Sequence, residues 1–381
     1  MKTNLILAAI AVVLGLLTFW ELRKDRQTFT AYDTIPRLFE GFTAENVRAI
    51  QIRQPKKKPE GDKKDEKPKD GEPAKPAEFD VLVMVKDDQT WKLADGELRG
   101  VPLVTSRIEV DILDHLKRIR IDRKALAKAE ADDAFLRERN LTDDTGTLIQ
   151  CIDANNNPVA ELILGKDASG GKWGEEVLKG YYVRKFDSKN PAGNKDVILY
   201  ETDYWVLNTD PDPWLDKKIH QFEEGKVKSF AFRNPKGKAA FTKDKVTDAA
   251  WKAVDAPAGT GAVRQGEVQN LLSRFRYVAA QKFRGPLPAK PVLGERGLEP
   301  GDFEVSATLE DGTVYSLWIG KKIPETQEMY ARANTSNFLF SVNEWDRTPY
   351  EKDPVEFFDP APASQPATQP TETAPATQPN K

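Results

Sequence analysis

The chain repeats one pattern of strands and a helix, and this duplication limits its possible folds more than any other feature. The first copy opens with VRAIQIRQ at 47–54 and the second with VKSFAFRN at 227–234, and both alternate apolar and polar residues like half-buried strands. A tryptophan strand follows in each copy, TWKLAD at 90–95 and AWKAVD at 250–255. Because equivalent apolar positions need equivalent cores, we expect two tandem units with one packing scheme.

Each copy continues with an amphipathic helix, which we expect at 107–120 and at 266–278. The apolar residues have the same helical spacing in both copies; they are Ile112, Leu113, Leu116 and Ile119 in the first, and Leu271, Leu272, Phe275 and Val278 in the second. Ser106 followed by Glu109 predicts a capping box at the start of the first helix.

Two hairpins are expected to close each copy. An ERNL turn (138–141) or an ERGL turn (295–298) precedes the first hairpin, which ends in Gly-Lys in both copies. In the second hairpin the matched residues are Tyr182 with Tyr330, Arg184 with Arg332, and Trp205 with Trp345. Strands joined by tight turns pair antiparallel. The pattern predicts an α+β fold, with a meandering antiparallel sheet and a packed helix in each of two units, 25–220 and 221–359.

Residues 4–20, NLILAAIAVVLGLLTFW, contain no charged side chain. As a helix they span about 26 Å, just short of a hydrocarbon core of about 30 Å. The sequence after them, ELRKDRQTF, has no small-residue cleavage site. We therefore expect residues 1–24 to be an uncleaved membrane anchor that spans once.

Two segments are too polar to join a core. Residues 55–78 hold eight lysines, seven acidic residues and five prolines, and they stand where the second copy has a short NPKGK turn. They are predicted to be a disordered insertion at a hairpin tip, which costs little because loop-closure entropy grows slowly with length. Residues 360–381 form a Pro/Thr/Gln/Ala tail that is also predicted to be disordered.

The sequence offers little catalytic chemistry. The formal net charge of −3 does not suggest nucleic-acid binding. Cys151, the single cysteine, lies in an apolar strand and is expected to be a buried hydrophobe rather than a nucleophile. His115 flanks the apolar stripe of the first helix and is expected to be half-buried and structural. His220, between the units, is expected to face solvent. The Gly170–Gly171 pair predicts a turn, not a phosphate cradle.

Three acidic pairs have the chemistry of calcium ligands or glycosidase carboxylates: Asp132 and Asp133, Asp143 and Asp144, and Asp210 and Asp212. The spacing of an EF-hand is missing, and each pair suits a helix start, a turn or, at 209–214, an extended proline corner. We therefore expect no catalytic, cofactor-binding or metal-binding residue, and no cofactor.

The order of these motifs resembles the DUF4340 family, a domain of unknown function. The matching features are the VRAIQI and W-K-L strands, the helix, the ERGL turn and the YYVR and VILY strands, and the resemblance covers residues 1–350 outside 55–78. Members have an N-terminal membrane helix and are often found beside ABC-type exporter components linked to gliding motility, which implies an accessory role in envelope transport. ERNL departs slightly from the usual Gly-Leu turn.

The charges that flank the anchor, Lys2 on one side and Arg23, Lys24 and Arg26 on the other, favour a cytoplasmic body, but this rule is weak for long domains. The resemblance favours an extracytoplasmic body, which we adopt. We therefore expect a non-enzymatic, membrane-tethered scaffold or accessory subunit of an ABC-type transport complex. The alternatives are a wall-polysaccharide or peptide-binding module, which needs an exposed aromatic groove, and a hydrolase, which needs two acids about 5–10 Å apart in a cleft.

Overall fold

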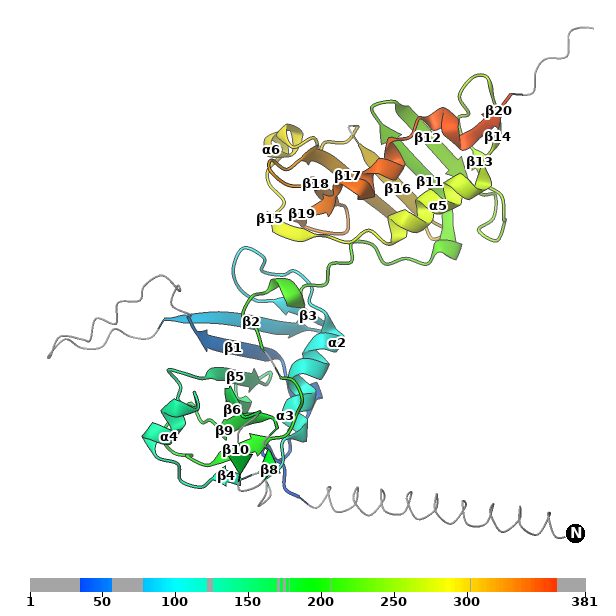
Figure 1. Cartoon of the computed structure of the whole chain (residues 1–381). Coiled ribbons are helices and arrows are strands. Elements are labelled where there is room, and N and C mark those ends of the chain that lie inside the picture. The colour runs from blue at the N-terminus through cyan, green and yellow to red at the C-terminus, as the bar shows by residue number, and fades with distance from the viewer. Residues whose placement is uncertain are drawn as a thin grey trace, which may run out of the picture. The chain divides into compact units, whose positions relative to one another are not determined.

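The computed structural model describes residues 35–56, 78–121, 126–169, 172–173, 176–177, 179–205, 207–301 and 303–361. Contacts within the chain divide it into two compact units, Met1–Asp216 and Lys217–Lys381 (Figure 1). The sequence pattern placed this boundary at residue 220.

Each unit contains one eight-stranded sheet in which every pairing is antiparallel, and the two sheets have the same strand order. The first runs β3-β2-β1-β5-β6-β9-β10-β4 and the second β13-β12-β11-β16-β17-β18-β19-β15. These mainly antiparallel sheets with few helices agree with the predicted α+β class. The edge strands β4 and β15, which follow the helix in each unit, were not predicted.

The strands of the first sheet are β1 (Ala49–Pro55), β2 (Phe79–Asp87), β3 (Thr90–Leu93), β4 (Leu126–Lys128), β5 (Thr147–Ile152), β6 (Pro158–Asp167), β9 (Tyr181–Lys185) and β10 (Val197–Tyr200). Those of the second are β11 (Val227–Asn234), β12 (Gly237–Thr242), β13 (Lys252–Ala253), β15 (Lys282–Pro286), β16 (Glu304–Leu309), β17 (Val314–Lys322), β18 (Glu328–Ala333) and β19 (Phe338–Asn343). Two small pairs are β7 (Lys172–Trp173) with β8 (Glu176–Val177), and β14 (Thr260–Val263) with β20 (Phe358–Pro360).

The short helices of the first unit are η1 (Ala44–Asn46), α4 (Asp133–Glu138) and η3 (Asp212–Trp214). Those of the second are η4 (Glu224–Lys226), α6 (Lys290–Glu295), α7 (Glu344–Arg347), η5 (Thr348–Glu351) and η6 (Pro354–Phe357). The segment at 209–214 therefore ends in a 3₁₀ turn, not in the extended corner that its prolines predicted.

The longest helical segment described in each unit packs against the sheet. In the second unit it is α5 (Gln265–Arg276), which lies along the sheet in Figure 1 and brings Phe275 to 6.1 Å from the ring of Phe230 on β11. In the first unit it consists of α2 (Thr105–Ile108), a π turn η2 (Glu109–Leu113) and α3 (Asp114–Arg118). Both apolar stripes are buried, as their spacing predicted.

The predicted capping box of the first helix is wrong. Val104 is the N-cap, and no side chain caps the helix. Ser106 lies within the first turn of α2 rather than at the N-cap position. Its hydroxyl therefore does not accept a hydrogen bond from the free N–H groups at the helix start.

The repeated Gly-Lys ending has a steric cause. A Cβ at Gly165 would lie 2.4 Å from the carbonyl oxygen of Arg139, and one at Gly320 would lie 2.1 Å from that of Arg296. The lysine that follows each glycine donates its backbone N–H to the same carbonyl, at 2.9 Å and 2.7 Å. Only glycine lets the two backbones approach this closely.

The ERNL and ERGL turns also have one geometry. Asn140 and Gly297 both have positive φ, +55° and +69°, and asparagine and glycine are the residues that accept this conformation most readily. The arginine before each lies over a tyrosine of the following sheet, Tyr182 at 5.3 Å and Tyr330 at 4.8 Å. The repeated motifs are therefore used for packing in both units.

The predicted match of Trp205 with Trp345 is wrong. The equivalent tyrosines, Tyr182 and Tyr330, pair with Leu199 on β10 and with Ser341 on β19. Counted from these partners, Trp205 lies two residues further along the chain than Trp345 does. Trp205 is 2% exposed and donates to the carbonyl of Asp111 at 2.8 Å, whereas Trp345 is 72% exposed.

The predicted anchor at 4–20 lies outside the described residues, as does the C-terminal tail beyond residue 361 and most of the 55–78 insertion. In the part of the chain that the structure describes, no helix is long and apolar enough to cross a membrane.

Candidate functional site

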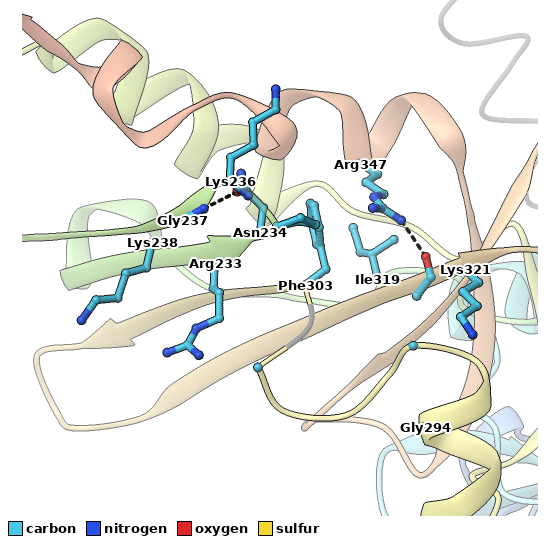
Figure 2. A pocket seen from close by; sticks show the side chains of 14 residues that line it. Arg233, Asn234, Lys236, Gly237, Lys238, Gly294, Phe303, Ile319, Lys321 and Arg347 are labelled. Atoms are coloured by element: carbon cyan, nitrogen blue, oxygen red, sulfur yellow. Dashed lines mark hydrogen bonds between the residues drawn. The ribbon is translucent and has the colours of Figure 1, made fainter. Parts of the chain in front are cut away.

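The candidate site is a cationic pocket in the second unit, with a volume of about 910 Å³ (Figure 2). Its walls come from the β11–β12 hairpin, the loop before β16, the end of β17 and α7. None of the described lining residues is acidic, and five are cationic: Arg233, Lys236, Lys238, Lys321 and Arg347.

Asn234 holds the hairpin in place. Its side-chain oxygen accepts the backbone N–H groups of Lys236 at 2.8 Å and Gly237 at 3.1 Å, which forms the turn. Its amide nitrogen donates to the carbonyls of Tyr350 at 2.6 Å and Lys352 at 2.9 Å. The residue is buried and fully bonded, so one wall of the pocket is rigidly attached to the segment after α7.

Arg347 lines the pocket and already has partners within the fold. Its Nη1 donates to the carbonyl of Gly320 at 2.8 Å, the bond dashed in Figure 2. Its guanidinium lies 4.6 Å from the ring centroid of Phe303, and its Nε is 2.8 Å from the carboxylate of Glu351. This arginine mainly positions the neighbouring backbone, and a ligand would meet only part of its charge.

Three other cations keep more of their charge for a ligand. Arg233 and Lys321 are exposed and form no ion pair within the described residues. Lys238 lies 3.7 Å from Asp255, an exposed pair that contributes little. Figure 2 shows the three side chains extending toward the side on which the loop 297–301 runs, while Lys236 extends the other way.

Arg233 has charged neighbours across both of its strand pairings. Lys238 lies directly opposite on β12, and Glu304 lies opposite on β16. No ion pair joins Arg233 to Glu304 in the described structure. The guanidinium instead reaches the loop 297–301, called the glycine loop below because Gly297 and Gly301 line the pocket. A Cβ at Gly301 would lie 3.7 Å from Nη1 of Arg233.

The first unit uses the equivalent arginine differently. Arg53 on β1 corresponds to Arg233 by strand register, but its cross-strand neighbour is Val81 where Arg233 has Lys238. Nη2 of Arg53 donates to the carbonyl of Asp143 at 3.0 Å. The arginine is therefore hydrogen-bonded within the fold in the first unit, whereas in the second it has no ion pair among the described residues.

His220 lines a second pocket of about 700 Å³, and the expectation that it faces solvent is wrong. It is 3% exposed, its ring lies 4.6 Å from that of Phe275 and 5.5 Å from that of Tyr315, and neither ring nitrogen has a hydrogen-bond partner among the described residues. Burial lowers the pKa of His220 to about 4 because the charged imidazolium loses its hydration.

The duplication shows why this histidine is buried. Ile219 donates its N–H to the carbonyl after α5 in the same way that Leu38 donates to the carbonyl after α3, so His220 stands where the first unit has Phe39. Phe39 is also buried. This equivalence is hard to see in the sequence. The segments before β1 and β11 differ in length, so aligning the two strands does not align Phe39 with His220.

His115 is half-buried, as predicted. Its Nδ1 lies 3.0 Å from the hydroxyl of Tyr200, and its ring stacks on Trp205 at 4.7 Å. Burial lowers the pKa of His115, and nearby Arg118 lowers it further. These contacts link the helix to the end of β10 and assign the residue to packing.

The acidic pairs take local structural roles. Asp132 caps α4 by accepting from the N–H of Phe135 at 2.7 Å, a bond that lowers the pKa of its carboxyl. Asp133 pairs with Lys195 at 3.0 Å.

In the next pair, Asp144 is 2.9 Å from Arg137, and a hydrogen bond from Thr142 is the main cause of its lowered pKa. The backbone carbonyl of Asp143 accepts the hydrogen bond from Arg53. Asp210 accepts the backbone N–H of Asp212 at 3.0 Å. In each pair at least one carboxylate therefore takes part in a cap, a turn or an ion pair.

Cys151 is fully buried in β5, and burial raises the pKa of its thiol. The Gly170–Gly171 turn lies outside the described residues. Among the residues that are described, no three His, Cys, Asp or Glu side chains are grouped as a metal site would require.

The cationic pocket was not predicted from the sequence. Its one local signal is the RNPKGK run at 233–238, which by itself predicts a turn. Its charges matter because the fold brings Lys321 and Arg347, from distant parts of the chain, to the same pocket.

No curated protein and no solved structure matches the chain. The family model described as a domain of unknown function, DUF4340, matches residues 97–293, from just after β3 into α6. This is a little over half of the chain and confirms the resemblance. The chain belongs to the DUF4340 family.

Proposed function

We propose that this protein is a non-enzymatic, membrane-tethered scaffold or accessory subunit of an envelope transport complex of the ABC type, with an extracytoplasmic body that acts by binding. The observation that carries the proposal is the cationic pocket. The pocket gathers several positive charges. The packing of the repeated fold does not require the charge of Lys238, because the first unit has Val81 at the equivalent position. Such a surface suits an anionic group on a partner.

The test is affinity capture of the full-length chain from native membranes in mild detergent. Wild-type protein is expected to recover transporter subunits, and the double variant Arg233→Glu/Lys238→Glu is expected to lose most of them. Lys228→Glu is the matched control, because Lys228 is an exposed lysine on the same strand, β11, that does not line the pocket. Recovery of no transporter subunit by the wild type would reject the transport assignment.

The polysaccharide- or peptide-binding alternative has one supporting observation. Trp345 on α7 is 72% exposed, two residues from Arg347. The other tryptophans whose side chains the structure describes are buried: Trp91, Trp205, Trp214, Trp251 and Trp318. A single exposed indole offers one stacking surface rather than an aromatic groove. Binding of wall glycan fragments that is lost in Trp345→Ala would favour this alternative.

For the hydrolase alternative, the pocket beside His220 offers two acidic lining residues, Glu223 and Asp311. Glu223 pairs with Lys226 at 3.0 Å. A hydrogen bond from the N–H of Thr313 is the main cause of the lowered pKa of Asp311, which disfavours a role as general acid. Glycosidase activity that disappears in Asp311→Asn would revive this alternative.

A further inference from the structure

We propose that the cationic pocket of the second unit binds a phosphate-bearing ligand with at least two negative charges. This inference rests on the proposed function in that both use the pocket, and it adds the chemistry of the group that is recognised. Arg233, Lys238 and Lys321 are the residues that contact it, and Arg347 positions the pocket backbone at Gly320.

The first argument is the crowding of like charge. Arg233 and Lys238 lie directly opposite each other on β11 and β12, and like charges in that relation destabilise a sheet. Lys238 lies 3.7 Å from the exposed carboxylate of Asp255. Arg233 forms no ion pair within the described residues, although Glu304 lies opposite it on β16. A bound dianion would compensate both charges at once.

The second argument is the glycine loop. The pocket is lined by Gly297 and Gly301, and each approaches one of the free cations. A Cβ at Gly301 would be 3.7 Å from Nη1 of Arg233, and one at Gly297 would be 3.4 Å from Cγ of Lys321. Both glycines have positive φ, so side chains are disfavoured there. The ligand can therefore lie against bare backbone with a cation at each end of the loop.

The third argument concerns the class of anion. A guanidinium binds phosphate through two parallel N–H donors, and ammonium groups bind it as point charges. A phosphate group offers three oxygens and close to two charges to these donors, whereas a carboxylate offers two oxygens and one charge. A volume of about 910 Å³ exceeds a single phosphate and suits a larger phosphorylated molecule or a headgroup.

The fourth argument is the comparison with the first unit. The equivalent Arg53 is held by the carbonyl of Asp143 and by the ring of Phe79, 4.4 Å away. In the part of the second unit that the structure describes, Arg233 has neither a carbonyl acceptor nor an aromatic ring as a partner. Where the two units agree, the residues serve packing, so this difference points to a role that is not packing.

The experiment measures binding of tripolyphosphate to the full-length chain in a neutral detergent by isothermal titration calorimetry. The comparison is with Arg233→Gln/Lys238→Val, which removes both charges and places the residue of the first unit at 238. We expect the double variant to bind at least tenfold more weakly and Lys228→Gln to change affinity less than twofold. Arg233→Gln alone, with circular dichroism on every variant, separates lost binding from lost folding.

Two further probes identify the source and the class of the ligand. Vesicles of phosphatidylcholine with and without phosphatidic acid test a lipid headgroup. Binding of either tripolyphosphate or the acidic vesicles that depends on Arg233 and Lys238 supports the proposal and names the source.

Three results overturn it: no binding of either probe, binding that the double variant does not weaken, or equally tight binding of the tricarboxylate tricarballylate. If partner capture still depends on these residues after such a result, the proposed function stands and only the phosphate assignment falls.

Discussion

Replacing His220 with phenylalanine tests whether the duplicated fold explains this buried imidazole. The folded pKa of His220 is about 4, below the value of 6.5 that applies to the unfolded chain. Between these values the unfolded state binds a proton that the folded state does not, so stability is fully present above pH 6.5 and is lost as the pH falls toward 4. From pH 7.5 to pH 5 this linkage removes about 2 kcal/mol from the second unit.

His220→Phe should abolish that loss, because phenylalanine does not titrate and Phe39 already fills the equivalent place in the first unit. At pH 7.5 the variant should also be more stable by about 1 kcal/mol, since two buried ring nitrogens without partners are removed. His115 and the carboxylates remain in both proteins, so their contributions cancel in the comparison.

The assay is hydrogen exchange of the full-length chain at pH 5.0 and pH 7.5, followed by mass spectrometry of peptides that cover β11 and β16. These peptides report the free energy of opening of the second unit, and peptides from β1 and β5 serve as the internal control. If wild type and His220→Phe lose the same opening free energy between the two pH values, the reasoning from the buried imidazole is refuted.

Three further outcomes are expected. Gly320→Ala should destabilise the second unit by more than 2 kcal/mol because its Cβ would overlap a backbone carbonyl, while Gly225→Ala, in open space, should change little; equal melting temperatures would contradict the close approach. Asn234→Ala should cost about 2 kcal/mol in urea unfolding through its buried hydrogen bonds, and an unchanged midpoint would argue against the hairpin attachment. Cys151 should react with a thiol reagent only after unfolding, and rapid labelling of the native chain would contradict its burial.

Local patterns in the sequence determined a large part of the architecture. Alternation of apolar residues identified the strands, helical spacing identified α5 and the helix of the first unit, and the repeated turn chemistry indicated antiparallel hairpins. These features are predictable because each depends on residues close together in the chain. The Gly-Lys repeat was noticed for the same reason, although its cause, a carbonyl 25 residues or so earlier, could not be read from the pattern.

Tertiary structure alone decided the environment of individual side chains. His220 is polar and follows two lysines, which suggests a solvent-exposed linker, yet the lead-in segment folds onto α5 and buries it. Trp205 and Trp345 occupy similar places in the sequence, but a two-residue difference in register buries one and exposes the other.

The cationic pocket is also a feature that only the tertiary structure decided. Its charges come from residues 233 to 347, and their proximity depends on which strands pair and in which register. The sequence by itself determined the periodicities and turns, because local chain geometry sets them. Which side chains meet at the hairpin tip was decided only by the tertiary structure, because pairing between distant strands sets those contacts.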